Sequence, residues 1–368
     1  MTVLFYLLTP FSYLELVGVR LILFQVLLGL VIVSYRVYKK PVLHLSPSFL
    51  ALYIVVAITA VYSFFSGFVD SLMAVSAFSL LMYFSFYMAS SGNVKIGKIK
   101  NVYLVSCLFI ALGLFFQVFV HKFFGVAMFR HQLFGGERNA YSFIWMDYSF
   151  VSLFVVSCLP IVLSLKGRVF SLFVVLLVLL ASTITSARTG IAAVSLFFIL
   201  LFSKGYFSTL IKGKIRPRYF MLAAVAFVIP FLFMYFLPVI TGRQLTASSS
   251  GRFDDFILGF NFLLEHPLFG VLLNNDLYGS LVSTVPHNVF LFALFTGGLI
   301  YFFSFAIFLG TLARDIRYAD SDILSSILIC FLGFQFIPSF FSAYFFAVLL
   351  GIAIASSRLN KRGCKENE

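Results

Sequence analysis

The chain has 368 residues, of which 62% are hydrophobic and 11% are charged. Soluble domains carry about 25% charged residues and are about half apolar, so this composition excludes an ordinary soluble fold. The formal net charge of +13 would suit nucleic-acid binding. Most basic residues, however, lie in short loops between apolar runs, which indicates a membrane protein with no nucleic-acid partner.

Apolar runs of about 20 residues predict membrane-spanning helices. Together they predict an all-α, polytopic transmembrane bundle of about 11–12 helices, forming a single integral membrane domain over residues 1–368. Residues 1–13 form a further short helix in one alternative, which would move the N-terminus to the cytoplasm. The expected spans are 14–35, 48–68, 71–90, 102–121, 147–165, 169–187, 189–203, 220–240, 287–310, 323–337 and 339–357.

Lys and Arg are distributed unequally between alternate loops, and this asymmetry orients a membrane protein. One set of alternate loops carries 19 of the 26 Lys and Arg residues, and the opposite set carries six. The richer set is expected in the cytoplasm. Two long loops, about 122–146 and 241–286, then lie on the outer side, and the larger one contains an amphipathic helix. Chemistry on the outer side would be placed on these loops.

The strongest local motif is His287-Asn288, followed after nine residues by Gly298 and then by Tyr301. On a continuous helix, the last two residues return close to the His287 face, and a glycine permits close helix contact. A His at the water edge of a rigid helix can orient or deprotonate a hydroxyl. An interfacial His that caps the helix, with the glycines serving only packing, explains the same residues.

A second motif, Ser249 to Asp255, opens a short amphipathic stretch from Arg252 to Glu265 that ends at His266-Pro267-Leu268-Phe269-Gly270. The acids Asp254 and Asp255 suit the positive end of a helix, but Arg252 does not. A helix N-terminus with a guanidinium makes an anion site matched to phosphate. Alternatively, Arg252 pairs with a carboxylate on an interfacial helix.

Further arginines are expected at the outer surface. Arg188 ends a polar stretch between two apolar runs, at a depth where a charge usually has a functional or ionic partner; snorkelling into headgroups is the alternative. Arg130 and Arg138 lie in the loop 122–146, near Gly136-Glu137, which is either a turn at a substrate mouth or a solvated loop. Arg243 lies in the loop 241–286.

Taken in order, these motifs resemble the O-antigen polymerase and O-antigen ligase superfamily. The resemblance lies in Ser250-Gly251-Arg252, then His266-Pro267-Leu268-Phe269-Gly270, then His287-Asn288 with Gly298 and Tyr301, and in Ser186-Ala187-Arg188-Thr189-Gly190. The motifs cover about 120 residues of the C-terminal half, while the N-terminal half agrees only in hydropathy.

The resemblance implies an inner-membrane, metal-independent glycosyltransferase whose active site faces the periplasm. Its donor would be an undecaprenyl-diphosphate-linked oligosaccharide, so no cofactor is expected. The family's two arginines correspond to Arg188 and Arg252, and its His to His287. We expect contacts to substrate from Asn288, Arg243, Arg130 and Arg138. Membrane lipids and a chain-length regulator protein are the other expected partners.

Within this resemblance, the outer loop 241–286 is small and leaves less room for a bulky acceptor, which favours a polymerase that joins repeat units. A ligase that transfers finished glycan to lipid A-core is the nearest rival. A transporter or flippase belongs to a different class. It should show polar residues through the midplane and broken helices in pairs. A structural scaffold would leave the outer arginines replaceable.

Overall fold

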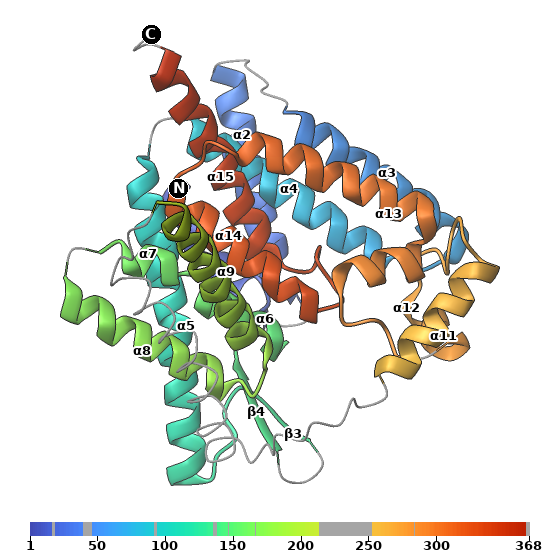
Figure 1. The fold of residues 1–368 in the computed structure, drawn as a ribbon, viewed down its shortest axis with the longest axis horizontal. Helices are drawn as coiled ribbons and strands as arrows, with labels where there is room; N and C mark the ends of the chain where they lie inside the picture. Colours follow the sequence, from blue (N-terminus) through green and yellow to red (C-terminus); the bar gives the residue numbers. More distant parts are fainter. Residues whose placement is uncertain are drawn as a thin grey trace. The chain divides into compact units, whose positions relative to one another are not determined.

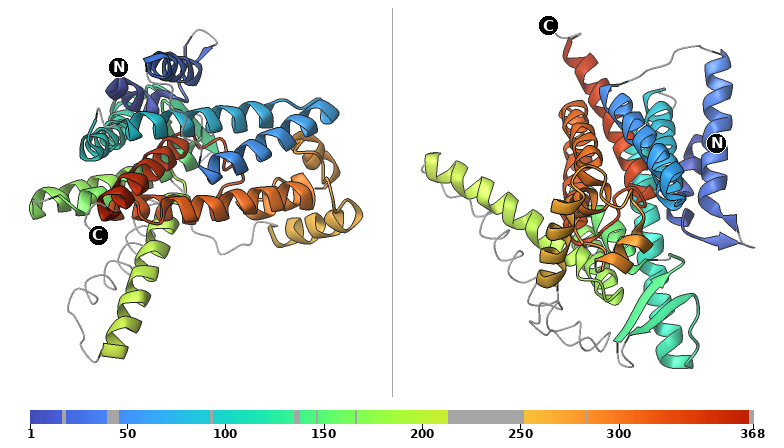
Figure 2. Two further views of the ribbon diagram at one scale, coloured as in Figure 1. Left: turned by 90° about the horizontal axis from the view of Figure 1, so that it is seen from above. Right: turned by 90° about the vertical axis from the view of Figure 1, so that its right-hand side faces the viewer.

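The computed structural model describes residues 1–16, 19–39, 46–91, 94–134, 138–145, 147–165, 167–212, 252–282 and 284–365. The chain forms two compact units, each of which is described here by itself (Figures 1 and 2). Unit 1 comprises 1–102, 248–324 and 334–368, and unit 2 comprises 103–247 and 325–333.

Five helices of the described part are long and apolar enough to cross a membrane. The chain is therefore an all-α, multi-pass membrane protein, as its composition predicted. The span predicted over 220–240 lies outside the described residues, so the total number of spans stays a prediction. The five helices are α2 (Leu21–Lys39), α3 (Pro47–Ser66), α4 (Asp70–Ser90), α5 (Ile96–Phe124) and α13 (Val289–Ile316).

The first span begins later than predicted. It was expected over 14–35, but α2 begins at Leu21, because a small hairpin of β1 (Glu15–Leu16) and β2 (Val19–Arg20) precedes it. Hydropathy extends a span through such a turn, since the flanking residues are apolar.

The first thirteen residues lie beside α2. They contain α1 (Thr2–Leu7) and a 3₁₀ turn over Thr9–Phe11. Arg36 donates to the Thr2 hydroxyl at 2.8 Å, and Gln25 donates to the Phe5 carbonyl at 3.0 Å. Thr2 therefore lies beside the Arg36 end of α2, and Phe5 lies beside Gln25 of that helix.

In unit 1, α4 packs closely against α15 (Tyr344–Lys365). A Cβ on Gly351 would lie 2.4 Å from the Met82 carbonyl oxygen, so only glycine permits this approach. Ser85 also donates to the Val348 carbonyl at 2.7 Å. Small residues commonly allow such close packing between membrane helices.

The helix α13 lies beside α3 (Figure 1). Its N-terminal end lies near α11 (Arg252–Glu265) and α12 (Asn275–Leu281). Its C-terminal end lies near the start of α3, because the Ser48 amide donates to Asp315 at 3.1 Å. We refer to the first as the His287 end and to the second as the Arg314 end.

Unit 2 contains shorter apolar helices and a hairpin. The loop predicted over 122–146 contains two antiparallel strands, β3 (Arg130–Phe134) and β4 (Arg138–Phe143), with an irregular register between Arg130 and His131. Gln117 of α5 holds the hairpin by donating to the Arg130 carbonyl and accepting from the Phe143 amide, each at 2.9 Å. The helices are α6 (Tyr148–Ser157), α7 (Leu159–Leu163), α8 (Arg168–Ile184), α9 (Thr189–Lys212) and most of α14 (Ser321–Gly333).

Candidate functional site

The helix α13 is broken at Gly298, which has φ 67° and ψ −174°. A left-handed φ is accessible to glycine without steric cost. A Cβ at this position would also lie 2.4 Å from the Leu268 carbonyl oxygen. Both the backbone conformation and the crowding therefore require glycine.

Residues 267–273 dock into this break. Leu299 donates to the Pro267 carbonyl at 2.9 Å, which supplies an acceptor to the start of the second half of α13. In return, the amides of Val271 and Leu273 both donate to the Thr296 carbonyl at 3.0 Å, at the end of the first half. The exposed backbone groups on both sides of the break are thus satisfied by the loop, as a lipid environment requires.

The docking loop has an unusual backbone. Gly270, Leu272 and Leu273 all have positive φ. A positive φ is costly for leucine, by roughly 1–3 kcal/mol, and persists only where surrounding contacts enforce it. Residues 266–270 and the Gly297-Gly298 pair, which are separate motifs in the sequence, therefore form one interlocked structure.

This break corrects one sequence expectation. The placement of Gly298 and Tyr301 on the His287 face assumed a continuous helix, and the non-helical Gly298 removes that phase relation. The Tyr301 side chain is buried in unit 1. The close contact expected at Gly298 is present, but its partner is the backbone of the docking loop and not another helix.

His287 is exposed and lines a cavity of about 160 Å³ at the start of α13, together with Asn288, Asp255, Thr284 and Gln335. The neighbouring Asn288 is the N-cap of α13. Its side-chain oxygen accepts from the amides of Phe290 and Leu291, at 2.9 and 3.1 Å. Asn288 therefore fixes where the helix begins and, with it, the position of His287.

The side-chain nitrogen of Asn288 also donates to Gln335 Oε1 at 3.0 Å. The amide group thus contacts helix backbone on one side and a second wall of the cavity on the other. These contacts give Asn288 a positioning role in the His287 cavity. A direct contact to substrate, as expected from the sequence, stays a prediction.

The first turn of α11 forms the opposite wall of the His287 cavity. Asp255 lines the cavity and accepts a hydrogen bond from Thr284 at 2.8 Å, which ties the first turn of α11 to the segment before His287. Arg252 is the first residue of α11, one turn before Asp255. The amphipathic helix predicted from Arg252 to Glu265 is confirmed.

The apolar side of α11 remains open in unit 1. Phe256, Ile257, Phe260 and Leu264 are each more than 40% exposed. In a membrane protein, such a face is suited to contact lipid. The opposite side carries Leu263, which packs with Val271, Tyr278 and Phe295 in a buried cluster joining α11, α12 and α13. Burial, and secondly the Asp255 charge, raise the pKa of Tyr278 to about 12, so its hydroxyl stays protonated.

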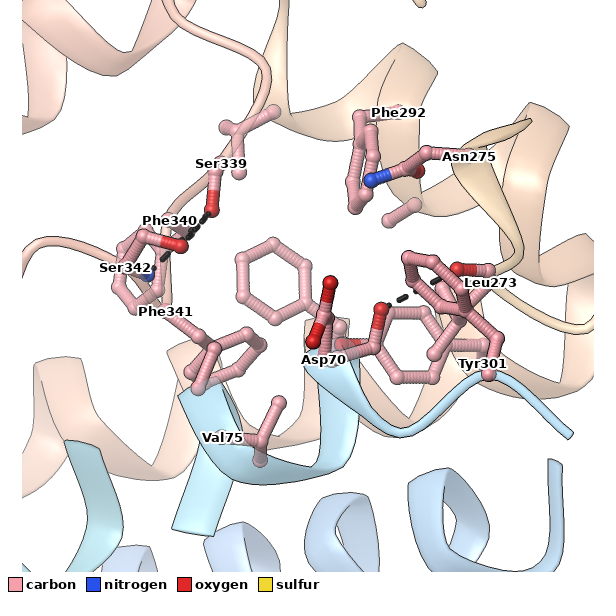
Figure 3. Close-up of a pocket in the computed structure, with 16 residues that line it drawn as sticks. Asp70, Val75, Leu273, Asn275, Phe292, Tyr301, Ser339, Phe340, Phe341 and Ser342 are labelled. Atoms are coloured by element: carbon pink, nitrogen blue, oxygen red, sulfur yellow. Dashed lines mark hydrogen bonds between the residues drawn. The ribbon is translucent and has the colours of Figure 1, made fainter. Parts of the chain in front are cut away.

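A second cavity, of about 150 Å³, lies on the other side of the first turns of α13 (Figure 3). The Asp70 carboxylate, from the start of α4, extends into it. Asn275 faces it from α12, and the Ser339–Ser342 turn lines another side. Phe292, Phe340 and Phe341 contribute aromatic rings.

The polar groups of this Asp70 cavity are the exposed Asp70 carboxylate, which is an acceptor, the Asn275 amide and the hydroxyls of Ser71, Ser339 and Ser342. The Asn275 side-chain oxygen is buried, and no hydrogen-bond partner for it occurs within the described residues. No described residue forms an ion pair with Asp70. An unpaired buried acceptor costs about 1–3 kcal/mol. The Asp70 carboxylate is exposed, so it can accept from hydroxyl or amine donors of a ligand, and the aromatic rings of the cavity suit the face of a sugar ring.

Arg188 lies in unit 2, at the start of α9. Its carbonyl accepts from the Ala192 amide at 2.9 Å, so Arg188 occupies the N-cap position, and its side chain is exposed. The turn before it is rigid, because Ser186 has φ 60° and the Gly190 amide donates to the Ser152 hydroxyl at 3.2 Å. The structure thus places Arg188 at a helix N-terminus, where the backbone amides favour an anion.

The other predicted arginines fall into three places. Arg130 is exposed in β3 of unit 2, and Arg138 begins β4 opposite Phe134. Arg243 lies outside the described residues. The structure therefore brings His287, Asn288 and the first turn of α11 together in unit 1. Arg188, Arg130 and Arg138 belong to unit 2, and their distance from His287 stays untested.

Comparison with models of protein families and with curated proteins finds no match. The resemblance described above therefore rests on the motifs themselves. Within unit 1, the first turn of α11 and His287 line one cavity, and residues 267–273 dock into the break of α13.

Sequence reasoning missed the Asp70 cavity. Asp70 is an acid at the start of a predicted span, where it also suits the helix dipole, so nothing in its neighbourhood marked it as unusual. Asn275 and Ser339 lie more than 200 residues further along the chain, and only the fold brings them to it. A polar Asn274-Asn275-Asp276 run inside the long outer loop was the available signal.

Proposed function

We propose that this chain is a membrane glycosyltransferase that polymerises surface-polysaccharide repeat units carried on undecaprenyl diphosphate, at the periplasmic face of a bacterial inner membrane. The single observation that carries the proposal is the convergence, at the first half of α13, of His287, the first turn of α11 and the docking loop. These are the segments on which the resemblance to the O-antigen polymerase and ligase superfamily rests.

In the proposed reaction, an acceptor hydroxyl oxygen attacks the anomeric carbon of the donor sugar. The bond between that carbon and the diphosphate oxygen breaks, and the diphosphate leaves with the electron pair. His287 accepts the proton of the hydroxyl. The guanidinium groups of Arg188 and Arg252 stabilise the negative charge that develops on the diphosphate, and charge-assisted hydrogen bonds of this kind contribute about 1.5–3 kcal/mol each.

The Asp70 cavity supports a hydroxyl-rich substrate. Its Asp70 carboxylate is complementary to the hydroxyl donors of a sugar, and its rings offer an apolar surface for the sugar face. Both cavities adjoin the first turns of α13. Val289 and Phe292 line the Asp70 cavity, and Asn288 and Leu291 line the His287 cavity. We assign the reacting hydroxyl of the acceptor and the diphosphate to the His287 cavity, and sugar units of the acceptor away from that hydroxyl to the Asp70 cavity.

One observation favours a second candidate, a transporter of lipid-linked glycan. The break at Gly298 makes α13 a discontinuous helix beside a partly polar cavity, and discontinuous helices line the substrate sites of many transporters. A transporter would move the lipid-linked unit without changing its length. A ligase would transfer complete chains to lipid A-core.

The proposal is tested by complementing a strain that lacks this chain with expression-matched variants and examining the glycan ladder. Arg188→Ala, Arg252→Ala and His287→Ala should each abolish long chains. Lys98→Ala, which changes an exposed residue at the Arg314 end, should give a normal ladder. Normal ladders from all three variants would refute the enzymatic proposal.

The nature of the product distinguishes the alternatives. A null strain that makes only a single repeat supports the polymerase, and complete chains accumulating on the carrier lipid support the ligase. The purified chain should extend lipid-linked repeat units without any other protein and should not glycosylate purified lipid A-core. Movement of the substrate across vesicles without any extension would support the transporter.

A further inference from the structure

A basic pocket lies at the Arg314 end of unit 1, far along α13 from the His287 cavity. It has a volume of about 280 Å³ and is lined by the last turn of α13 and the C-terminal part of α15. Its charged lining residues are Arg314, Arg317, Arg358, Lys361 and Asp315. Four positive charges therefore face one negative charge.

The single carboxylate of this pocket already has a partner, because Asp315 accepts from the Ser48 amide at 3.1 Å. The two acids that follow α13 are also engaged, since Asp320 and Asp322 bind Lys100 at 3.1 and 2.7 Å. In the described part of the chain, Arg314, Arg317 and Lys361 form no ion pair. Among the described residues, the positive charges of Arg314, Arg317 and Lys361 are thus not neutralised by an ion pair.

The basic side chains are partly held in place by their surroundings. The Arg317 guanidinium lies 4.6 Å from the ring centroid of Tyr318, and that of Arg358 lies 4.7 Å from the ring of Phe86. The Tyr318 amide donates to the Ser357 hydroxyl, which joins the two walls of the pocket. Arginine held in this way is suited to bind phosphate oxygens in a defined geometry.

An apolar stripe leads along α13 to this pocket. Ile300, Phe303 and Ile307 are 38%, 58% and 59% exposed, and they recur at the three- and four-residue spacing of one helix face. The same spacing continues to Gly310, where an added Cβ would meet no atom within 4 Å, and then to Arg314. An open apolar track thus ends at a cluster of cations.

We propose that this pocket binds the phosphate group of an anionic phospholipid whose acyl chain lies along the Ile300–Ile307 stripe. A free phosphate would use the cations but not the stripe, whereas a lipid uses both. Basic residues at the cytoplasmic ends of spans are expected from topology alone, but topology does not require a shared pocket with an apolar track. The proposal is independent of glycosyl transfer.

The test uses the full chain in nanodiscs of phosphatidylcholine, with or without phosphatidylglycerol, and native mass spectrometry to count retained lipids. Phosphatidylglycerol should be retained over phosphatidylcholine by at least tenfold. The double variant Arg314→Gln/Arg317→Gln should lose that preference. The matched double variant Lys95→Gln/Lys98→Gln, which removes two charges outside the pocket, should keep it within twofold.

Three further measurements separate a lipid site from misfolding of the variant and from binding of free phosphate. Arg314→Lys/Arg317→Lys retains the charge and should keep most of the preference, so a poorly folded Gln variant does not decide the question. Phe303→Gln should weaken lipid retention several-fold. Inorganic phosphate should not compete with phosphatidylglycerol. Competition by phosphate, or full retention of phosphatidylglycerol by the Gln double variant, would overturn the lipid site.

Discussion

The two ends of α13 leave opposite kinds of polar group available. At the His287 end, the Asp70 cavity offers a carboxylate, which is an acceptor, and the helix itself is interrupted. At the Arg314 end, the helix is regular and the pocket offers guanidinium and ammonium donors. One helix thus joins a site suited to hydroxyl-bearing ligands to a site suited to phosphate.

The acids at the two ends illustrate the difference. Asp320 at the Arg314 end is paired with Lys100 at 3.1 Å. Asp70 at the His287 end has no ion-pair partner in the described ranges. A paired carboxylate has an evident structural role, while an exposed, unpaired one that extends into a cavity is available to a ligand. Stability and activity should therefore respond differently at the two ends.

The largest effect is expected from Gly298→Ala. The new Cβ would lie 2.4 Å from the Leu268 carbonyl and would require a left-handed alanine, so we expect a loss of several kcal/mol and little folded protein. Gly310→Ala in the second half of the same helix meets no neighbour and should be neutral or stabilising by up to about 1 kcal/mol. Fluorescence-detected gel filtration and thermal melting in detergent compare the two. Equal behaviour would mean that the break is not needed for folding.

An intermediate effect is expected from Asn288→Ala. It removes the cap of α13 and the bond to Gln335, at a cost of about 2 kcal/mol. Asn288→Asp keeps the capping oxygen and should recover about half of that loss. The midpoint of thermal unfolding measures both. If the two variants melt alike, the cap does not set the stability of this end.

The smallest effects compare two acids. Asp320→Asn keeps the oxygen that accepts from the Asp322 amide but removes the charge beside Lys100, which should cost about 1 kcal/mol after allowance for solvent screening. Asp70→Asn should change stability by less than about 0.5 kcal/mol, and yet shorten the glycan ladder. A stability loss at Asp70 as large as that at Asp320 would point to a structural role and weaken the assignment of the acceptor site.

The sequence predicted the regular helices well. The spans expected over 48–68 and 71–90 are found at Pro47–Ser66 and Asp70–Ser90. Membrane thickness fixes the length of an apolar run, so composition alone locates such helices. The amphipathic helix from Arg252 was predicted for the same kind of reason, since its periodicity is local.

The remaining features depend on distant contacts. The left-handed Gly298 exists because residues 267–273 dock against it, and a glycine pair in an apolar run does not reveal that. The hairpin at Arg130–Phe143 replaces a predicted loop because Gln117 holds its backbone. The Asp70 cavity requires Asn275 and Ser339, which no local pattern connects.

The interlock between the docking loop and α13 also bears on how the chain enters the bilayer. The first half of α13, about nine residues, is roughly 13 Å long and cannot cross about 30 Å of hydrocarbon by itself. Residues 267–273 precede it in the chain, so they have already been synthesised when Gly298 leaves the ribosome. Residues 267–273 can then bind the break while the two halves of α13 insert. The unpaired backbone groups at the break need not face lipid.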